Sequence, residues 1–408
     1  MKTICIAGKN DIAVDVMLYC KENYPNNRLI CVTNRNERGI NSWQKSAKWF
    51  AEKNNIEIVE LKDVYEIEDL LFLSTEFDRI VRPDRFKTDE LYNIHFSMLP
   101  KYKGCFTAIM PLLNAEKSTG VTLHRMRAGI DTGEIVEQRA IEIEDNDTSY
   151  DVYKKCLKNG TELIIKNLDK LLTGNVSTYA QDAKQSTYYS NKAIDYSNLC
   201  LDINMTAFQI QNQIRAFCFR PYQLLNWNGV SYIECTITDK VSNEKPGTVL
   251  YDNDLYTKIA TIDYDVIMYK DTFDEVLEAI KNKDNDRAKY LCESHKIIES
   301  KDSHGWSALT VAVYNNNFEM VQWLIANGAD INVLNNNGTN LLMYAKNCFV
   351  NTGDTTIFYY LKDKGLTFSQ KDYYGKNLYD YCQEEKIKMI GKYNLTLEKI
   401  GGDCPKTS

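Results

Sequence analysis

Short apolar runs alternate with amphipathic segments along the first part of the chain. Apolar positions at Ile12, Val16, Tyr19 and Cys20 have helical spacing and predict a helix over residues 12–21, after a buried strand at 2–7 and a turn at 8–11. Further strands are predicted at 29–33, 56–59 and 78–81, and a second helix at 43–53. Strands that alternate with helices at this pitch indicate a parallel sheet in a doubly wound, Rossmann-like α/β domain.

The pattern changes around residues 176–268. Residues 204–219 predict a helix, and alternating polar and apolar positions predict strands at 232–237, 248–250 and 266–269. Pro246-Gly247 is a turn signal between two of these strands. This stretch therefore predicts a small antiparallel β module.

The last third of the chain contains a repeat. The segment that starts at Gly305 resembles the segment at Gly338, 33 residues later, and a third copy starts at Gly375, after another 37 residues. With the intervening Gly-Ala-Asp-Ile-Asn turn at 328–332 and a diverged unit at 273–304, this pattern indicates all-α ankyrin repeats. We expect a catalytic domain at 1–180, the β module at 181–268, ankyrin repeats at 269–395 and a tail at 396–408.

Composition narrows the class of protein. The 408 residues include 49 basic and 56 acidic side chains, and the net charge of -7 argues against broad contact with nucleic acid. Twelve cysteines without a Cys-x-x-Cys pair, and only four histidines, predict reduced thiols and no metal site. No signal-peptide core and no apolar run near the roughly 18 residues of a membrane helix occur, so a cytoplasmic protein without membrane contact is expected.

Candidate chemistry lies in residues 93–135. Asn93 and His95 alternate on one face of an extended segment, and Asp131 lies in a loop bounded by glycines. An amide donor, an imidazole that titrates near neutrality and a carboxylate are the groups that acyl transfer to an amine requires. Residues 8–10 form a turn after the first strand, but the dinucleotide-binding glycine spacing is missing.

These motifs resemble the folate-dependent formyltransferases. The family pattern Asn-Ile-His-Pro-Ser-Leu-Leu-Pro-x-Tyr-Arg-Gly is matched at residues 93–104, with Phe96 in place of Pro and Lys103 in place of Arg, and the pattern Asp-x-Gly-x-Ile is matched at 131–135. The resemblance implies 10-formyltetrahydrofolate as formyl donor and no metal. It also implies that His95 is the general base, Asn93 stabilises the oxyanion and Asp131 fixes the ionisation of His95. The implied folate-binding residues are Arg79, Val81, Arg127, Gly129 and Ile130.

Residues 6–10 and 215–222 are similar to the sugar N-formyltransferases within this family. That similarity implies a dTDP-linked aminodideoxyhexose as acceptor, with dTDP-3-amino-3,6-dideoxyglucose favoured because of the ankyrin tail, in bacterial O-antigen and lipopolysaccharide synthesis. Lys9 and Asn10 would contact the diphosphate, and Tyr222 the nucleotide. Alternatives are a dTDP-4-amino-4,6-dideoxyglucose enzyme, or a non-catalytic protein that binds partners through its ankyrin repeats. The intact Asn93, His95 and Asp131 favour an enzyme.

Several residues have a second interpretation. Lys9 and Asn10 equally fit a plain turn, Tyr222 fits a packing role, and His124 is expected to be structural. Trp306 occupies a position where ankyrin repeats often carry a large exposed side chain, yet it could stack on a base in an auxiliary nucleotide site. The repeats themselves could bind a protein or a small molecule, and a homodimer through the β module is expected from the resemblance.

Overall fold

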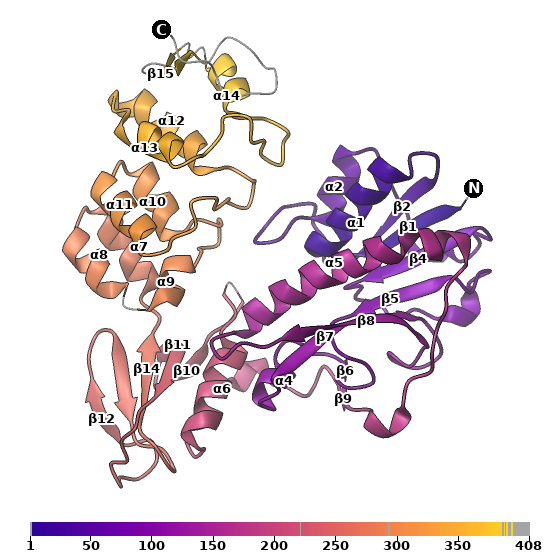
Figure 1. Cartoon of the computed structure of the whole chain (residues 1–408), viewed down its shortest axis with the longest axis horizontal. Coiled ribbons are helices and arrows are strands. Elements are labelled where there is room, and N and C mark those ends of the chain that lie inside the picture. The colour runs from indigo at the N-terminus through magenta and orange to yellow at the C-terminus, as the bar shows by residue number, and fades with distance from the viewer. Residues whose placement is uncertain are drawn as a thin grey trace. The chain divides into compact units, whose positions relative to one another are not determined.

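Seven strands form the central sheet of the first half of the chain, in the order β3-β2-β1-β4-β5-β7-β8 (Figure 1). In this computed structural model the first five strands of that order are parallel, and β7 and β8 are antiparallel. Their bounds are β1 Thr3–Gly8, β2 Arg28–Thr33, β3 Glu57–Ile58, β4 Leu70–Thr75, β5 Leu91–His95, β7 Ser118–Arg125 and β8 Ile135–Glu142. The predicted α/β class is confirmed, and the parallel sheet is extended by an antiparallel edge.

One predicted strand is wrong. Residues 78–81 form a loop. The strand in this part of the chain is instead β4, which ends before the loop and whose six residues are all buried. Ile80 is 82% exposed in that loop, and Pro83 starts the short helix η1 (Pro83–Arg85). A proline cannot donate to a neighbouring strand, so the apolar residues at 80 and 81 do not continue into a sheet.

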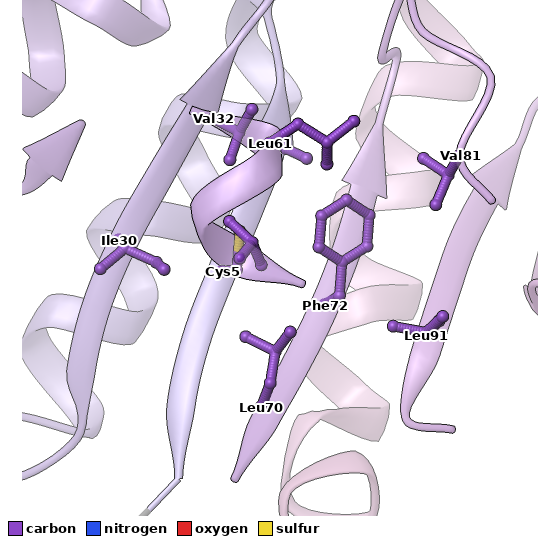
Figure 2. Packing of buried hydrophobic residues seen from close by; sticks show 10 residues of the cluster. Cys5, Ile30, Val32, Leu61, Leu70, Phe72, Val81 and Leu91 are labelled. Carbon is purple, nitrogen blue, oxygen red and sulfur yellow. The ribbon is translucent and has the colours of Figure 1, made fainter. Parts of the chain in front are cut away.

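Both faces of the sheet are covered. The helices α1 (Asn10–Asn23), α2 (Ala47–Lys53) and α5 (Ser149–Thr173) pack against it and against one another. On the other face, the short helix α3 (Leu61–Val64) and the loop after β4 cover a cluster that includes Cys5, Phe72 and Leu91 (Figure 2). Burial on both faces explains why β1 and β4 are continuous apolar runs without alternation.

A second, five-stranded sheet has the order β10-β11-β14-β13-β12. Its strands are β10 Leu225–Trp227, β11 Val230–Ile237, β12 Val249–Asp252, β13 Tyr256–Ile259 and β14 Val266–Lys270, and the helix α6 (Ala207–Phe217) precedes it. The predicted helix at 204–219 and the three predicted strands correspond to α6, β11, β12 and β14. The remaining elements before the repeats are α4 (Met110–Leu113), β6 (Lys103–Gly104), β9 (Tyr188–Tyr189), η2 (Ala183–Gln185) and η3 (Tyr196–Asn198).

Helix pairs make up the repeat region. They are α7 (Phe273–Lys281) with α8 (Asn285–Leu291), α10 (Ala308–Tyr314) with α11 (Phe318–Ala326), and α12 (Leu341–Thr352) with α13 (Thr356–Asp363). The further elements are α9 (His295–Glu299), α14 (Leu378–Glu384), β15 (Met389–Ile390) and β16 (Tyr393–Asn394). The same turn precedes α10, α12 and α14: the side chains of Asp302, Asn335 and Asp372 each accept two backbone N–H groups, two and four residues ahead.

The structure describes residues 2–220, 222–292, 294–385, 387, 389–390 and 393–394. They fall into two units, one from Met1–Gly229, Cys235–Gly247 and Ala260–Val266, the other from Val230–Glu234, Thr248–Ile259 and Ile267–Ser408. The predicted boundaries at 180, 268 and 395 stay predictions, and the predicted tail at 396–408 lies outside the described residues.

Candidate active site

The strand β5 brings two of the predicted catalytic residues to the carboxyl end of the parallel sheet. Asn93 is paired with Ser74 of β4 on one side and with His124 of β7 on the other. His95 is the last residue of β5 and is only 7% exposed. Ligands of doubly wound sheets bind beyond the carboxyl ends of the parallel strands, so this is the expected place for chemistry.

The two ring nitrogens of His95 have different neighbours. Its Nε2 lies 2.8 Å from the carbonyl oxygen of Tyr102, and its Nδ1 lies 3.5 Å from Oδ2 of Asp131. Since a carbonyl oxygen only accepts hydrogen bonds, Nε2 carries the proton of the neutral ring and Nδ1 is the basic atom. Burial lowers the pKa of His95, although Asp131 and the Tyr102 carbonyl oppose that shift. Burial therefore favours the neutral form of the His95 ring.

Asp131 is held as a carboxylate. Its backbone has a positive φ of 51°, and its Oδ2 accepts a hydrogen bond of 2.9 Å from the backbone N–H of Gly104. Burial opposes its ionisation, but His95, His124 and the Gly104 N–H together lower the pKa of Asp131 well below its usual range. The charge stands beside Nδ1 of His95, where it stabilises the imidazolium ion that forms when His95 accepts a proton.

His124 lies beside this group and contacts Asn93, which is compatible with the expected structural role. Its Nδ1 donates to the carbonyl oxygen of Arg125 at 2.8 Å, and its Nε2 accepts a hydrogen bond of 3.1 Å from Nδ2 of Asn93. The same Nε2 lies 3.6 Å from Oδ1 of Asp131. The amide group of Asn93 is thereby oriented, with its second N–H left for a ligand.

A strap formed by residues 181–189 braces the catalytic loops. The side-chain amide of Gln181 donates to the carbonyl oxygens of Asp131 and Gly133 at 2.8 and 2.7 Å. At the other end of the strap, Thr187 accepts from the N–H groups of Tyr102 and Lys103, at 2.7 and 2.9 Å. These contacts fix both the carbonyl that holds His95 and the loop that carries Asp131. No motif in the sequence of this segment pointed to such a role.

The predicted folate-binding segments share one apolar cluster. Val81 is buried there and points toward Phe72 and Leu91 in Figure 2, and Met126, just before the loop at 127–130, packs on the same cluster. Among the described residues, no backbone hydrogen bond involves the N–H or C=O of Val81. Ile80 and Ile130 are 82% and 45% exposed. Free main-chain groups beside exposed apolar side chains fit a flat heterocycle with polar edges, such as a pterin.

The side chains of the predicted arginines point to structural roles. The guanidinium group of Arg79 donates to the Thr33 carbonyl oxygen at 2.6 Å and lies 4.9 Å from the ring centre of Phe77. Nε of Arg127 donates to Glu134 at 3.1 Å. Gly129 has a φ of 101°, a conformation that favours glycine at this point of the loop. The side chains of Arg79 and Arg127 are thus both occupied within the protein.

A cavity of about 240 Å³ in the first unit contains the predicted substrate residues Lys9, Asn10 and Tyr222 in its wall. Aromatic side chains make up much of the rest: Trp43, Phe96, Phe106, Tyr153, Tyr196 and Phe219. The ring of Tyr222 lies 5.4 Å from the rings of both Trp43 and Phe219, although Tyr222 is 63% exposed. The side-chain amide of Asn10 donates to Glu76 and Tyr153, which occupies it within the protein.

Trp306 belongs to the second unit. Its ring lies 4.9 Å from Tyr314 and 5.2 Å from Tyr344, and Tyr314 is 48% exposed. In the described residues no group of three His, Cys, Asp or Glu side chains could hold a metal. The helices of that described part include none that is long and apolar enough to cross a membrane.

Known proteins match both halves of the chain. The family described as Formyl transferase matches residues 70–168, and a family of three ankyrin repeats matches residues 276–372. The solved N-formyltransferase of Helicobacter canadensis, in complex with folinic acid and dTDP-3-aminofucose, is 40% identical, with a TM-score of 0.62. The similarity covers 66% of this chain and 100% of that one. The chain belongs to the formyltransferase family. The predicted family and the predicted ankyrin repeats are thus confirmed.

Other formyltransferases are similar to the same region. WlaRD, a sugar 3N-formyltransferase solved in the presence of dTDP and 5-N-formyl-THF, is 42% identical over 66% of this chain and 98% of its own, with a TM-score of 0.62. The methionyl-tRNA formyltransferase of Thermotoga maritima is 32% identical over 50% of this chain and 68% of its own length. The methionyl-tRNA formyltransferase of Thermotoga neapolitana is 35% identical, and this chain spans about half of its length, 51%.

Proposed function

We propose that this formyltransferase moves a formyl group from 10-formyltetrahydrofolate to the amino group of a dTDP-linked aminodideoxyhexose. The preferred acceptor is dTDP-3-amino-3,6-dideoxyglucose, for bacterial O-antigen and lipopolysaccharide synthesis in the cytoplasm. The proposal is carried by one observation: Asn93, His95 and Asp131 lie together at the carboxyl end of the parallel sheet, beside an aromatic cavity. The two solved relatives at 40% and 42% identity have titles that name a dTDP-3-amino sugar or a sugar 3N-formyltransferase.

The residues support a direct transfer. Bound 10-formyltetrahydrofolate supplies an electrophilic formyl carbon, on which the amine of the sugar forms the new C–N bond. His95 takes a proton from that amine through Nδ1, and Asp131 stabilises the resulting imidazolium ion. Asn93 donates to the oxyanion of the tetrahedral intermediate, an interaction worth about 3 kcal/mol in comparable sites. When the bond to the folate nitrogen breaks, His95 returns the proton to the leaving group.

Binding roles are proposed for the cavity and the folate loops. Lys9 would meet the diphosphate at the N-terminus of α1, where backbone N–H groups and the helix dipole favour anions. Tyr222 would stack on the nucleotide, and the main chain of Val81 and of residues 127–130 would bind the pterin. A base stacked on Trp306 in an auxiliary nucleotide site, a protein partner for the repeats and a homodimer through the β module stay predictions.

The purified chain should be incubated with 10-formyltetrahydrofolate and a panel of dTDP-3-amino and dTDP-4-amino sugars. We expect tetrahydrofolate and an N-formylated nucleotide sugar, detected by absorbance and mass spectrometry, with the highest kcat/KM for a 3-amino sugar. Turnover only with a 4-amino sugar would select the alternative acceptor. Turnover only with methionyl-tRNA or glycinamide ribonucleotide would contradict the sugar assignment, and no turnover with any acceptor would favour a binding protein.

A further inference from the structure

One carboxyl group lies in the cavity and takes no part in the proposed mechanism. Glu76 directly follows the last residue of β4, Thr75, which is paired with Gly8 of β1 and with Ile94 of β5. The register therefore puts Glu76 level with Lys9 on one neighbouring strand end and with His95 on the other. Adjacent strands of a sheet lie about 4.8 Å apart, so Glu76 stands between the predicted phosphate contact and the predicted base.

The carboxyl group is fixed in position by neutral donors. The hydroxyl of Tyr153 lies 2.9 and 2.8 Å from its two oxygens, and the amide of Asn10 donates to Oε2 at 3.3 Å. Tyr153 is itself held by the amide of Gln44, which donates to its hydroxyl at 2.8 Å. Tyr153 of α5 and Asn10 of α1 thus hold the carboxyl group directly, and Gln44 holds it indirectly through Tyr153.

The backbone at this point is strained. Glu76 has a φ of 56° and Asn10 a φ of 67°, both in the left-handed region. Asparagine adopts this region readily, whereas for glutamate the conformation costs about 1 kcal/mol. Strain of this kind persists where the surrounding structure holds it and concentrates at functional sites. A hydrogen-bonded glutamate held in such a conformation within a cavity wall is therefore a candidate for ligand binding.

Charge defines what this group can bind. Lys9 and Glu76 are the charged residues in the described cavity wall, and the others are polar or apolar. Burial raises the pKa of Glu76, with a smaller contribution from Asp11, while Tyr153 and Lys9 oppose the shift. Tyr153 and Asn10 nevertheless both donate to the Glu76 oxygens, so the group is placed as a hydrogen-bond acceptor. Lys9 therefore suits the diphosphate, and Glu76 suits a donor. On an amino sugar the donors are the amine and the ring hydroxyls.

We propose that Glu76 determines specificity by accepting a hydrogen bond from the sugar ring of the substrate, at the amine or at a hydroxyl beside it. The inference rests on the proposed function, because it presupposes an amino sugar in the cavity. Glu76 would hold the ring so that the amine faces Nδ1 of His95. Asn10 then acts by holding Glu76. This role replaces the direct contact of Asn10 with the diphosphate that the sequence predicts.

The test compares Glu76→Gln with the wild-type protein. The amide keeps the shape and one acceptor but loses the charge, and a hydrogen bond to a charged group commonly accounts for a tenfold or larger factor. We expect kcat/KM for the dTDP-amino sugar to fall at least about tenfold, with the KM for 10-formyltetrahydrofolate unchanged. Glu57→Gln is the matched control, because Glu57 lies on β3 of the same sheet with its side chain 55% exposed, and it should leave both constants unchanged.

Two further variants separate binding from folding. Tyr153→Phe removes the hydroxyl that holds Glu76 while keeping the ring, and we expect a smaller loss of kcat/KM than in Glu76→Gln. Glu76→Asp keeps the charge but shortens the side chain, and it should also raise the KM of the sugar. Thermal unfolding of each variant shows whether it folds. A folded Glu76→Gln protein with wild-type kcat/KM for the sugar would overturn the proposal.

An analogue distinguishes the two possible donors. With a dTDP-amino sugar that lacks the hydroxyl beside the amine, the effect of Glu76→Gln should vanish if the hydroxyl is the donor and persist if the amine is. Either result supports the role of Glu76. Absence of sugar turnover by the wild-type protein would instead contradict the proposed function, so the two failures are distinguishable.

Discussion

The two ring nitrogens of His95 have different neighbours, and each neighbour affects the ring in a different way. The Tyr102 carbonyl oxygen selects the tautomer, and Asp131 faces the other nitrogen. Because burial keeps the ring neutral and the adjacent carboxylate stabilises the protonated form, the ring can accept a proton and give it back. This is the property that a base needs when the same proton must later reach a leaving group.

Replacing His95 by Asn should abolish most turnover. A general base commonly accounts for a factor of about 100 to 10,000 in rate, and an amide cannot accept the amine proton. We expect kcat for the sugar to fall by at least about 100-fold. The shorter Asn side chain does not reach the Tyr102 carbonyl oxygen, so the folded protein should lose about 1 kcal/mol of stability with that hydrogen bond. Retained turnover in a folded His95→Asn protein would show that another group is the base.

The titration of His95 should lie below the usual histidine pKa of about 6.5. Burial is the larger cause of this shift, and the Asp131 carboxylate opposes it. With only four histidines in the chain, NMR of the imidazole C–H groups can resolve them, and His95→Asn assigns the signal. Removing the charge in Asp131→Asn should lower the pKa of His95 further. A wild-type titration above 6.5 would contradict the assigned environment.

The sequence could place Asn93 and His95 on one face of a strand, but it could not predict the contact between His124 and Asn93. Alternation along an extended segment places Asn93 and His95 on one face, and this needs only local structure. His124 reaches Asn93 because β5 and β7 are antiparallel in a particular register. That register depends on which strands pair, and no local pattern in the sequence specifies it. Finding this contact would have required a prediction that the strand of Asn93 pairs with the strand of His124.

Among the elements, β4 shows a second limit of prediction from sequence. Its residues are uniformly apolar up to Ser74, and a short apolar run without alternation cannot be told from a buried helix segment. Residues 78–81 end in the β-branched pair Ile80 and Val81, which favours a strand, but they form the loop that carries the predicted folate contacts. The mistaken strand directly follows the true one along the chain, so the predicted α/β class is confirmed although this strand is misplaced.

The short pairing of β6 with β9 should make Gly104 irreplaceable. Gly104 has a φ of 85°, and a Cβ atom there would lie 2.3 Å from the carbonyl oxygen of Tyr189. Gly104→Ala should therefore displace the strap and the N–H that holds Asp131, with kcat reduced at least about tenfold and a loss of stability of about 2 kcal/mol or more. Chemical denaturation and steady-state kinetics measure the two effects.

Gly174→Ala is the control for that substitution. Gly174 has a similar φ of 72°, but the nearest atom to an added Cβ is 3.8 Å away. This variant should lose about 1 kcal/mol from backbone strain alone and keep its kcat. If both variants lose stability equally and keep full activity, the contact of Gly104 with the strap is not needed for catalysis.

At the scale of the whole molecule, the cysteines report on packing in both units. Nine of the eleven described cysteines are buried, and Cys105 and Cys200 are exposed. A thiol reagent added to the native protein should modify these two first among the described cysteines, with the others reacting after unfolding. Burial raises the pKa of Cys105, so it should react more slowly than a free thiol at neutral pH.

Peptide mapping of the modified protein identifies the labelled sites, and the Cys105→Ser, Cys200→Ser double variant is the control. Rapid labelling of Cys5 or Cys348 in the native state would contradict the packing of the first or second unit, respectively. The assay thus tests both units in one experiment without separating them.

The turns before α10, α12 and α14 are built alike, yet they are spaced 33 and then 37 residues apart. The difference is in the helices, because α12 has 12 residues where α10 has 7, and α13 has 8 where α11 has 9. The first helix of the pair is therefore five residues longer and the second is one residue shorter, while the turn that follows is built in the same way. The length of a repeat in this array can thus change inside a helix pair while the turn that begins the next repeat is kept.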